Sequence, residues 1–120
     1  MFDFSGKTAV ITGAGGAIGG EIARGLTQAG AGVAIWDIDP DAARRKADEI
    51  STATGGQVLA VECDAVLKSS VEAALDKTVA HFGTVDMLVN GAGGDRKVPP
   101  PARNLSSSTL IRRQLARVST

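Results

Sequence analysis

The sequence TGAGGAIG, at residues 12–19, follows the apolar run TAVI at residues 8–11 and opens a helical pattern. A strand that enters a glycine-rich turn before a helix forms a site for a phosphate group. Glycines let the backbone come close to the ligand, and the N–H groups and dipole of the helix favour negative charge. A P-loop would end in Gly-Lys-Ser/Thr, whereas Gly19-Gly20-Glu21 stands here. We therefore predict a phosphate site other than a P-loop; the alternative is a structural turn without a ligand.

Four apolar runs of strand length alternate with three helical patterns over residues 1–94. The runs are continuous, which is typical of strands covered on both faces, and helices between them imply right-handed crossovers. The predicted fold is therefore α/β, a Rossmann-type doubly wound parallel sheet of order 3-2-1-4, truncated after strand 4, with a ligand crevice between strands 1 and 4. The runs are Ala9–Ile11, Val33–Trp36, Val58–Val61 and Met87–Val89.

The helical patterns carry signals for their ends and for their buried faces. Asp39 is the expected N-cap of the second helix with Pro40 at its first position, and residues 69–72 (SSVE) form a capping box for the third. Helix C-caps are expected at Gly30, Gly55 and Gly83. The expected buried faces are Ile18, Ile22, Leu26 and Ala29, then Ala43, Ala47 and Ile50, then Val71, Leu75, Val79 and Phe82.

The bulk composition describes a globular chain of at most one domain. It has 120 residues, 43% hydrophobic and 22% charged, with a net charge of zero that attracts neither nucleic acid nor an anionic membrane. Cys63, the single cysteine, has no partner for an internal disulfide. We find no membrane span and no signal peptide, and expect a cytoplasmic location.

Composition changes near residue 97. Residues 1–97 hold all 13 acidic residues, whereas residues 98–120 hold four of the 13 basic residues and no acid. Three of the four prolines stand at 99–101, which excludes a helix interior or a central strand there. We interpret residues 98–120 as an irregular or disordered tail, joined to the first part by a frameshift or a wrongly assigned gene end.

Asp37 ends the second strand, 24 residues after Gly13. A carboxylate at this place can accept hydrogen bonds from both hydroxyls of an adenosine ribose and would repel a 2′-phosphate. Ile38 follows, so no cation stands beside that phosphate. Asp37 and Ile38 together favour NAD over NADP. The alternative is that Asp37 is a loop aspartate that caps a local turn.

Two further strand ends carry polar or small residues. Asp64 follows Cys63 after the third strand, where its carboxylate could accept a hydrogen bond from the adenine amino group. The phospho-acceptor aspartate of a receiver domain is a rival interpretation, but it needs acidic metal ligands after strand 1, where this chain has glycines. The sequence NGAGG at residues 90–94 ends the fourth strand, and its small residues would let a cofactor lie against the backbone.

In the glycine-rich turn, in the residues at the strand ends and in the spacing between them, residues 6–94 resemble the short-chain dehydrogenase/reductase family. The resemblance rests on GKTAVITG at 6–13, on Ile18-Gly19, and on VNGAG at 89–93, with Asp37 and Asp64 between them. The family binds NAD(P) on a doubly wound sheet and interconverts alcohols and carbonyls. The resemblance implies that residues 12–19 hold the pyrophosphate, Asp37 the adenosine ribose, Asp64 the adenine, and residues 90–93 the sugar on the nicotinamide side.

The expected cofactor is NAD, and no metal ligands are expected. Residues 1–97 are thus predicted to be the NAD(P)-binding half of a Rossmann domain. The predicted cofactor-binding residues are Thr12, Gly13, Gly15, Gly16, Ala17, Ile18, Gly19, Asp37, Ile38, Asp64, Ala65, Asn90, Gly91, Ala92 and Gly93.

The chain departs from the family pattern in three ways. Ala17 replaces a glycine of the pattern TGxxxGxG, and Gly91 replaces the second asparagine of NNAG. The chain also has no tyrosine and no lysine after Lys97, whereas the family uses tyrosine as general acid/base beside a lysine and a serine.

We therefore predict that this chain has no catalytic residue and is inactive on its own. An alcohol or carbonyl substrate is expected only for a full-length form. The resemblance also implies that the family's oligomer helices are missing. Two alternatives stay open: a non-catalytic dinucleotide- or adenosine-binding module, and an interaction fragment that uses its arginine-rich tail.

Overall fold

The computed structural model describes residues 3–13 and 17–90, leaving aside the side chains of Ala17 and Ile18. Its elements alternate along the chain, and all neighbouring strands are parallel, in the order β3-β2-β1-β4. This confirms the predicted strand order. The elements are β1 (Thr8–Thr12), α1 (Ala17–Gln28), β2 (Gly32–Asp37), α2 (Pro40–Thr54), β3 (Val58–Glu62), α3 (Lys68–Phe82) and β4 (Met87–Asn90).

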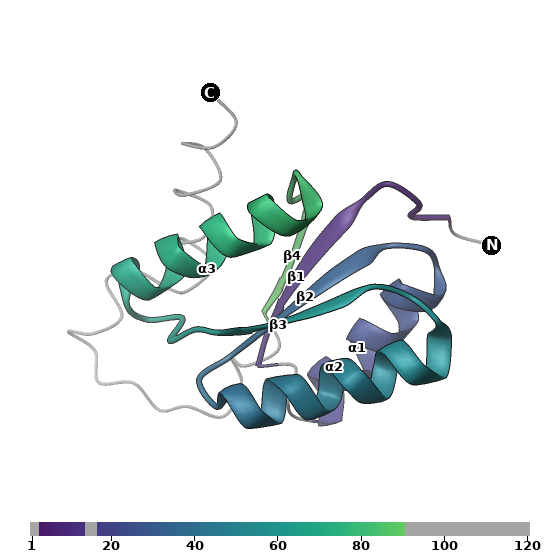
Figure 1. Cartoon of the computed structure of the whole chain (residues 1–120), viewed down its shortest axis with the longest axis horizontal. Coiled ribbons are helices and arrows are strands. Elements are labelled where there is room, and N and C mark those ends of the chain that lie inside the picture. The colour runs from purple at the N-terminus through teal and green to yellow at the C-terminus, as the bar shows by residue number, and fades with distance from the viewer. Residues whose placement is uncertain (1–2, 14–16, 91–120) are drawn as a thin grey trace.

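Helices cover both faces of the sheet (Figure 1): α1 and α2 lie on one face and α3 on the other. Side chains alternate between the two faces along each strand. Val10, Ala34 and Trp36 point into the core under α3, whereas Ile11 and Ile35 point into the core under α1 and α2. Every residue of β1 is buried, as the continuous apolar runs predicted.

The ends of α2 match the sequence signals. The Asp39 carboxylate accepts hydrogen bonds from the backbone N–H of Asp41 at 3.0 Å and of Ala42 at 3.2 Å, and Pro40 follows as the first helical residue. At the other end Gly55, with φ 73°, donates its N–H to the Ser51 carbonyl at 2.8 Å. Asp39 therefore fixes where the chain leaves the end of β2 and enters α2.

The predicted capping box of α3 is wrong. The helix begins at Lys68 with Leu67 at the N-cap position and no side-chain cap, so Ser69 lies inside the first turn. A backbone turn starts the helix early, because the Leu67 N–H donates to the Asp64 carbonyl at 3.0 Å. The Ser70 hydroxyl is instead the acceptor for the Asp64 N–H, at 2.8 Å. The C-cap at Gly83, with φ 90°, is as predicted.

The buried face of α1 differs from the predicted one. Ile22 is 36% exposed, whereas its neighbour Ala23 is fully buried and Thr27 is 5% exposed. The small Ala23 side chain lets the helix approach the sheet closely, and the Thr27 hydroxyl is satisfied by the Ala23 carbonyl at 2.7 Å. Beyond the helix, Gly30 has φ 99° and donates to the Thr27 carbonyl at 3.0 Å, which confirms it as the terminating glycine.

Candidate functional site

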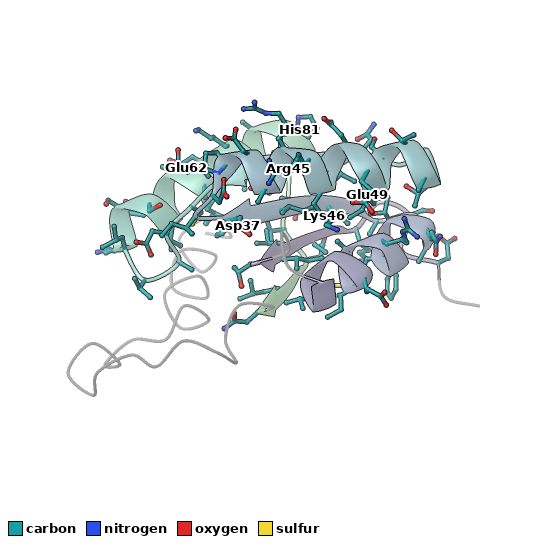
Figure 2. The ribbon with its side chains drawn as sticks, turned by 90° about the horizontal axis from the view of Figure 1, so that it is seen from below. Asp37, Arg45, Lys46, Glu49, Glu62 and His81 are labelled. Atoms are coloured by element: carbon teal, nitrogen blue, oxygen red, sulfur yellow. The ribbon has the colours of Figure 1, made fainter. Side chains whose placement is uncertain are left out.

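The carboxyl ends of the four parallel strands meet at one edge of the sheet. Thr12 is in register with Trp36 on β2 and with Asn90 on β4, and Asp37 is in register with Glu62 on β3. Figure 2 shows Asp37 and Glu62 at this end of the molecule. Ligands of open α/β sheets bind outside this edge, so the predicted contacts on β1, β2 and β4 lie where a ligand would be.

A side-chain hydrogen bond joins the ends of β1 and β4. The buried Thr12 hydroxyl donates to Asn90 Oδ1 over 2.9 Å, across 78 residues of sequence. Next along the chain, Gly13 adopts φ 70°, which favours glycine, and its N–H donates to the Trp36 carbonyl at 2.8 Å. Thr12 and Gly13 therefore fix the start of the glycine-rich turn against both neighbouring strands.

A small pocket of about 100 Å³ opens between the ends of β1, β2 and β3. It brings together five residues that the sequence assigned to the cofactor. Two other lining residues, Trp36 and Cys63, were not among the predicted contacts, and each stands directly before a predicted contact at a strand end. The lining residues are Gly13, Trp36, Asp37, Ile38, Cys63, Asp64 and Ala65.

The two carboxylates of the pocket are held by local hydrogen bonds. Asp37 Oδ1 accepts from the Asp39 N–H at 3.0 Å, and the Asp37 carbonyl accepts from the Cys63 N–H at 2.9 Å. Asp64 Oδ1 accepts from the Val66 N–H at 3.1 Å. The described lining residues include both acids and no lysine or arginine, and these two carboxylates suit hydroxyl and amino donors.

The Cys63 side chain is a neutral, buried thiol in this pocket wall, 3% exposed. Burial raises its pKa above the ordinary value of 9.0; a hydrogen bond from Ser70 opposes the rise and the nearby Asp64 charge adds to it. A thiol of this kind packs as a small apolar group and is a poor nucleophile near neutral pH.

Trp36 is almost fully buried beneath the pocket, at 1% exposure. Its indole Nε1–H donates to the Thr78 hydroxyl of α3 at 3.0 Å, and that hydroxyl donates to the Ala74 carbonyl at 2.8 Å. The chain holds one tryptophan. All tryptophan fluorescence therefore comes from a residue that lines the pocket and lies in the core under α3.

Several predicted contacts lie outside the described residues: Gly15, Gly16, Gly91, Ala92 and Gly93, together with the side chains of Ala17 and Ile18. Gly19 is described and lies buried in the first turn of α1. Within residues 3–13 and 17–90, no group of three His, Cys, Asp or Glu side chains is arranged to hold a metal ion. No helix in this part of the chain is both long and apolar enough to cross a membrane.

A second hollow, of about 220 Å³, lies between α1 and α2. It is larger than the pocket at the strand ends, but its charges are mixed. Glu21 and Arg24 line it from α1, and Lys46 and Glu49, which form a 3.2 Å ion pair, line it from α2. Figure 2 shows Lys46 and Glu49 on α2, away from the end marked by Asp37 and Glu62. None of the predicted contact residues lines it.

The family model described as short chain dehydrogenase matches residues 7–117. The chain therefore belongs to the short-chain dehydrogenase/reductase family, as its motifs indicated. The matched range runs past residue 97, where composition changes. The boundary at residue 97 and the separate origin of residues 98–120 both stay predictions.

Curated relatives are longer than this chain. The 7alpha-hydroxysteroid dehydrogenase of Escherichia coli (strain K12) is 46% identical over 94 residues, which are 78% of this chain and 36% of the relative. The D-threitol dehydrogenase of Mycolicibacterium smegmatis is 38% identical over 113 residues, which are 91% of this chain and 43% of the relative. The chain thus spans less than half the length of these two enzymes.

Solved structures share the fold. A crystal structure of hydroxysteroid dehydrogenase from Escherichia coli has a TM-score of 0.84 and 38% identity, covering 96% of this chain and 53% of that one. A crystal structure of NAD+-bound xylitol dehydrogenase has a TM-score of 0.81 and 25% identity, covering 95% of this chain and 48% of that one. As a family member, the chain carries the fold that binds nicotinamide dinucleotides.

Proposed function

We propose that this chain holds the adenosine half of NAD at the carboxyl edge of its sheet. The observation that carries the proposal is the pocket that joins Gly13, Asp37 and Asp64 from three different strand ends. Asp37 binds the ribose hydroxyls and Asp64 accepts a hydrogen bond from the adenine amino group. Ile38 and Ala65 supply apolar contacts beside them.

NAD is preferred to NADP, because a 2′-phosphate would lie beside the Asp37 carboxylate. Two like charges about 5 Å apart repel each other by a few kcal/mol at the dielectric typical of a protein surface. None of the described residues that line the pocket is a lysine or an arginine. We therefore expect the 2′-phosphate to lower affinity at least tenfold, which corresponds to about 1.4 kcal/mol.

The remaining parts of the cofactor extend from this pocket along the edge of the sheet. In our proposal the turn at residues 12–19 binds the pyrophosphate, and residues 90–93 lie against the sugar on the nicotinamide side. The Thr12–Asn90 hydrogen bond, at 2.9 Å, supports this assignment because it ties these two segments together. Helix α1 begins at Ala17, within residues 12–19, so its N-terminal N–H groups favour an anion there.

We further propose that these 120 residues bind the cofactor without oxidising or reducing a substrate. Proton transfer to a carbonyl oxygen needs a positioned acid, and the family's tyrosine has no counterpart here, because the sequence contains none. The alcohol or carbonyl substrate would require the longer form of the protein. Residues 1–97 then act as a cofactor-binding half-domain.

The test is a titration of the chain with ADP-ribose, followed through Trp36 fluorescence. We expect saturable binding that weakens at least tenfold in Asp37→Ala and is unchanged in Glu49→Ala, which alters only the hollow between α1 and α2. NADH should bind no more tightly than ADP-ribose. Absence of saturation by wild-type protein at millimolar ADP-ribose would refute the proposal.

A further inference from the structure

Ser70 makes a contact that its place in the sequence does not explain. It lies in the first turn of α3, half-buried, and its hydroxyl oxygen accepts the Asp64 N–H over 2.8 Å. Its neighbour Ser69 is exposed. A serine in a first helical turn commonly serves the helix itself, whereas this hydroxyl serves the preceding loop.

Asp64 is fixed at its N–H, its carboxylate and its carbonyl. The carboxylate accepts from the Val66 N–H at 3.1 Å, and the carbonyl accepts from the Leu67 N–H at 3.0 Å. These two bonds join residues two and three apart, so they shape the loop without placing it. Among the hydrogen bonds of residues 3–13 and 17–90, the one to Ser70 ties Asp64 to the body of α3, which is anchored in the core through Val71.

The other end of this loop is tied to the sheet. The Cys63 N–H donates to the Asp37 carbonyl at 2.9 Å, which couples the ends of β2 and β3. The Ser70 hydroxyl also lies near the Cys63 thiol, where it opposes the rise in the pKa of that thiol. Ser70 therefore lies beside two consecutive residues of the pocket wall, Cys63 and Asp64, and its hydrogen bond is to Asp64.

We propose that Ser70 is a positioning residue for adenine recognition, which holds the Asp64 carboxylate at the distance from Asp37 that an adenosine requires. The inference rests on the proposed function. A single glycosidic bond joins the ribose to the adenine, so the two carboxylates that bind them must keep a separation within a narrow range. Asp37 is placed by β2, whereas Asp64 lies beyond the end of β3 and depends on α3 through Ser70.

The test compares ADP-ribose with its hypoxanthine counterpart, which carries a carbonyl in place of the adenine amino group. Wild-type protein should prefer ADP-ribose. Ser70→Ala should weaken ADP-ribose binding about fivefold and remove most of the preference, because one hydrogen bond is worth about that factor. Ser69→Ala should match wild type, and Ser70→Thr, which keeps the hydroxyl, should restore the preference.

A double-mutant cycle separates positioning from general damage. If Ser70 acts through the Asp64 carboxylate, Ser70→Ala should cost no further affinity in an Asp64→Ala background. The inference would be overturned if Ser70→Ala lowered the affinity for ADP-ribose equally in the wild-type and Asp64→Ala proteins. It would also be overturned if Ser70→Ala left the preference for ADP-ribose over the hypoxanthine compound unchanged. Should Ser70→Ala fail to fold, a Ser70→Thr protein that folds but lacks the preference would overturn it as well.

The same titrations distinguish this inference from the proposed function. Wild-type protein that binds neither ligand refutes the adenosine site itself. Wild-type protein that binds both ligands equally keeps the site but refutes the role of Asp64, and with it the role of Ser70.

Discussion

Asp37 combines two roles at the end of β2. Its backbone carbonyl accepts the Cys63 N–H at 2.9 Å, whereas its carboxylate accepts the Asp39 N–H at 3.0 Å and faces the pocket. A substitution that keeps the size of the side chain but removes its charge therefore tests the electrostatic role alone.

We expect Asp37→Asn to reduce the preference for ADP-ribose over its 2′-phosphate at least tenfold, because the neutral amide does not repel the phosphate. The measurement is the ratio of the two dissociation constants at low ionic strength, where the repulsion is least screened. Glu62→Gln, at the end of β3 but outside the pocket lining, is the control and should leave the ratio unchanged. A ratio in Asp37→Asn equal to that of wild type would exclude this role.

Cys63 gives a prediction on pH. Its pKa in the folded chain lies above the ordinary value of 9.0, because burial disfavours the thiolate. Below the pKa of the unfolded thiol both states are neutral; as pH rises through it, the unfolded chain ionises first and the free energy of unfolding falls. We expect the fall in the free energy of unfolding at alkaline pH to be smaller in Cys63→Ala than in wild type. The measurement is urea unfolding at a series of pH values that spans the pKa of the unfolded thiol.

Thiol labelling checks the same residue independently. Native protein at pH 8 should react slowly with an aromatic disulfide reagent and rapidly in urea, and the single cysteine makes the signal unambiguous. Fast labelling of the native chain would mean that Cys63 is neither buried nor neutral.

At the residue scale, the sequence predicted the charged and small contacts of the pocket but not all of its wall. Asp37 and Asp64 could be found because a polar residue directly after an apolar run marks the end of a strand. Trp36 and Cys63 were not among the predicted contacts, and both are buried. That they also line the pocket depends on how far β2 and β3 extend beside each other, which no local pattern records.

At the scale of the elements, α2 is where the local signals are complete. Asp39 caps two backbone N–H groups and Gly55 ends the helix with φ 73°. We expect Asp39→Ala to lower the free energy of unfolding by about 1 kcal/mol, because it leaves those N–H groups without their carboxylate partner. The measurement is urea unfolding followed by Trp36 fluorescence.

Asp48→Ala removes an exposed carboxylate from the same helix and serves as the control. It should change stability by less than about 0.5 kcal/mol. Equal losses in the two variants would show that net charge, rather than the cap, accounts for the effect.

The other two helices show where pattern alone was insufficient. Periodicity placed Ile22 on the buried face of α1, yet the helix turns Ala23 and Thr27 toward the sheet, because small side chains permit a closer approach. For α3, SSVE at residues 69–72 satisfies the capping pattern, but the turn from Asp64 to Leu67 starts the helix sooner. The first difference comes from tertiary packing against the sheet, and the second from a local backbone turn that the capping pattern does not include.

At the scale of the whole molecule, β4 is the outer strand of the described sheet, beside β1. Its residues Met87, Leu88 and Val89 are only half-buried, although their continuous apolar sequence predicted a strand covered on both faces. An apolar strand at the edge of a sheet is a template for association. We expect the 120-residue chain to associate as its concentration rises, observed as an increasing sedimentation coefficient. A sharp, reversible thermal transition in a sample that stays monomeric would contradict this.

The central claim is that an adenosine binds at the ends of β1, β2 and β3, and amide chemical shifts in a ¹⁵N-labelled chain titrated with ADP-ribose test it most directly. We predict saturable shifts at Gly13, Asp37, Ile38, Asp64 and Ala65, and none at Lys46 or Glu49 in the hollow between α1 and α2. Shifts confined to that hollow, or no saturable shift at the strand ends, would contradict the account.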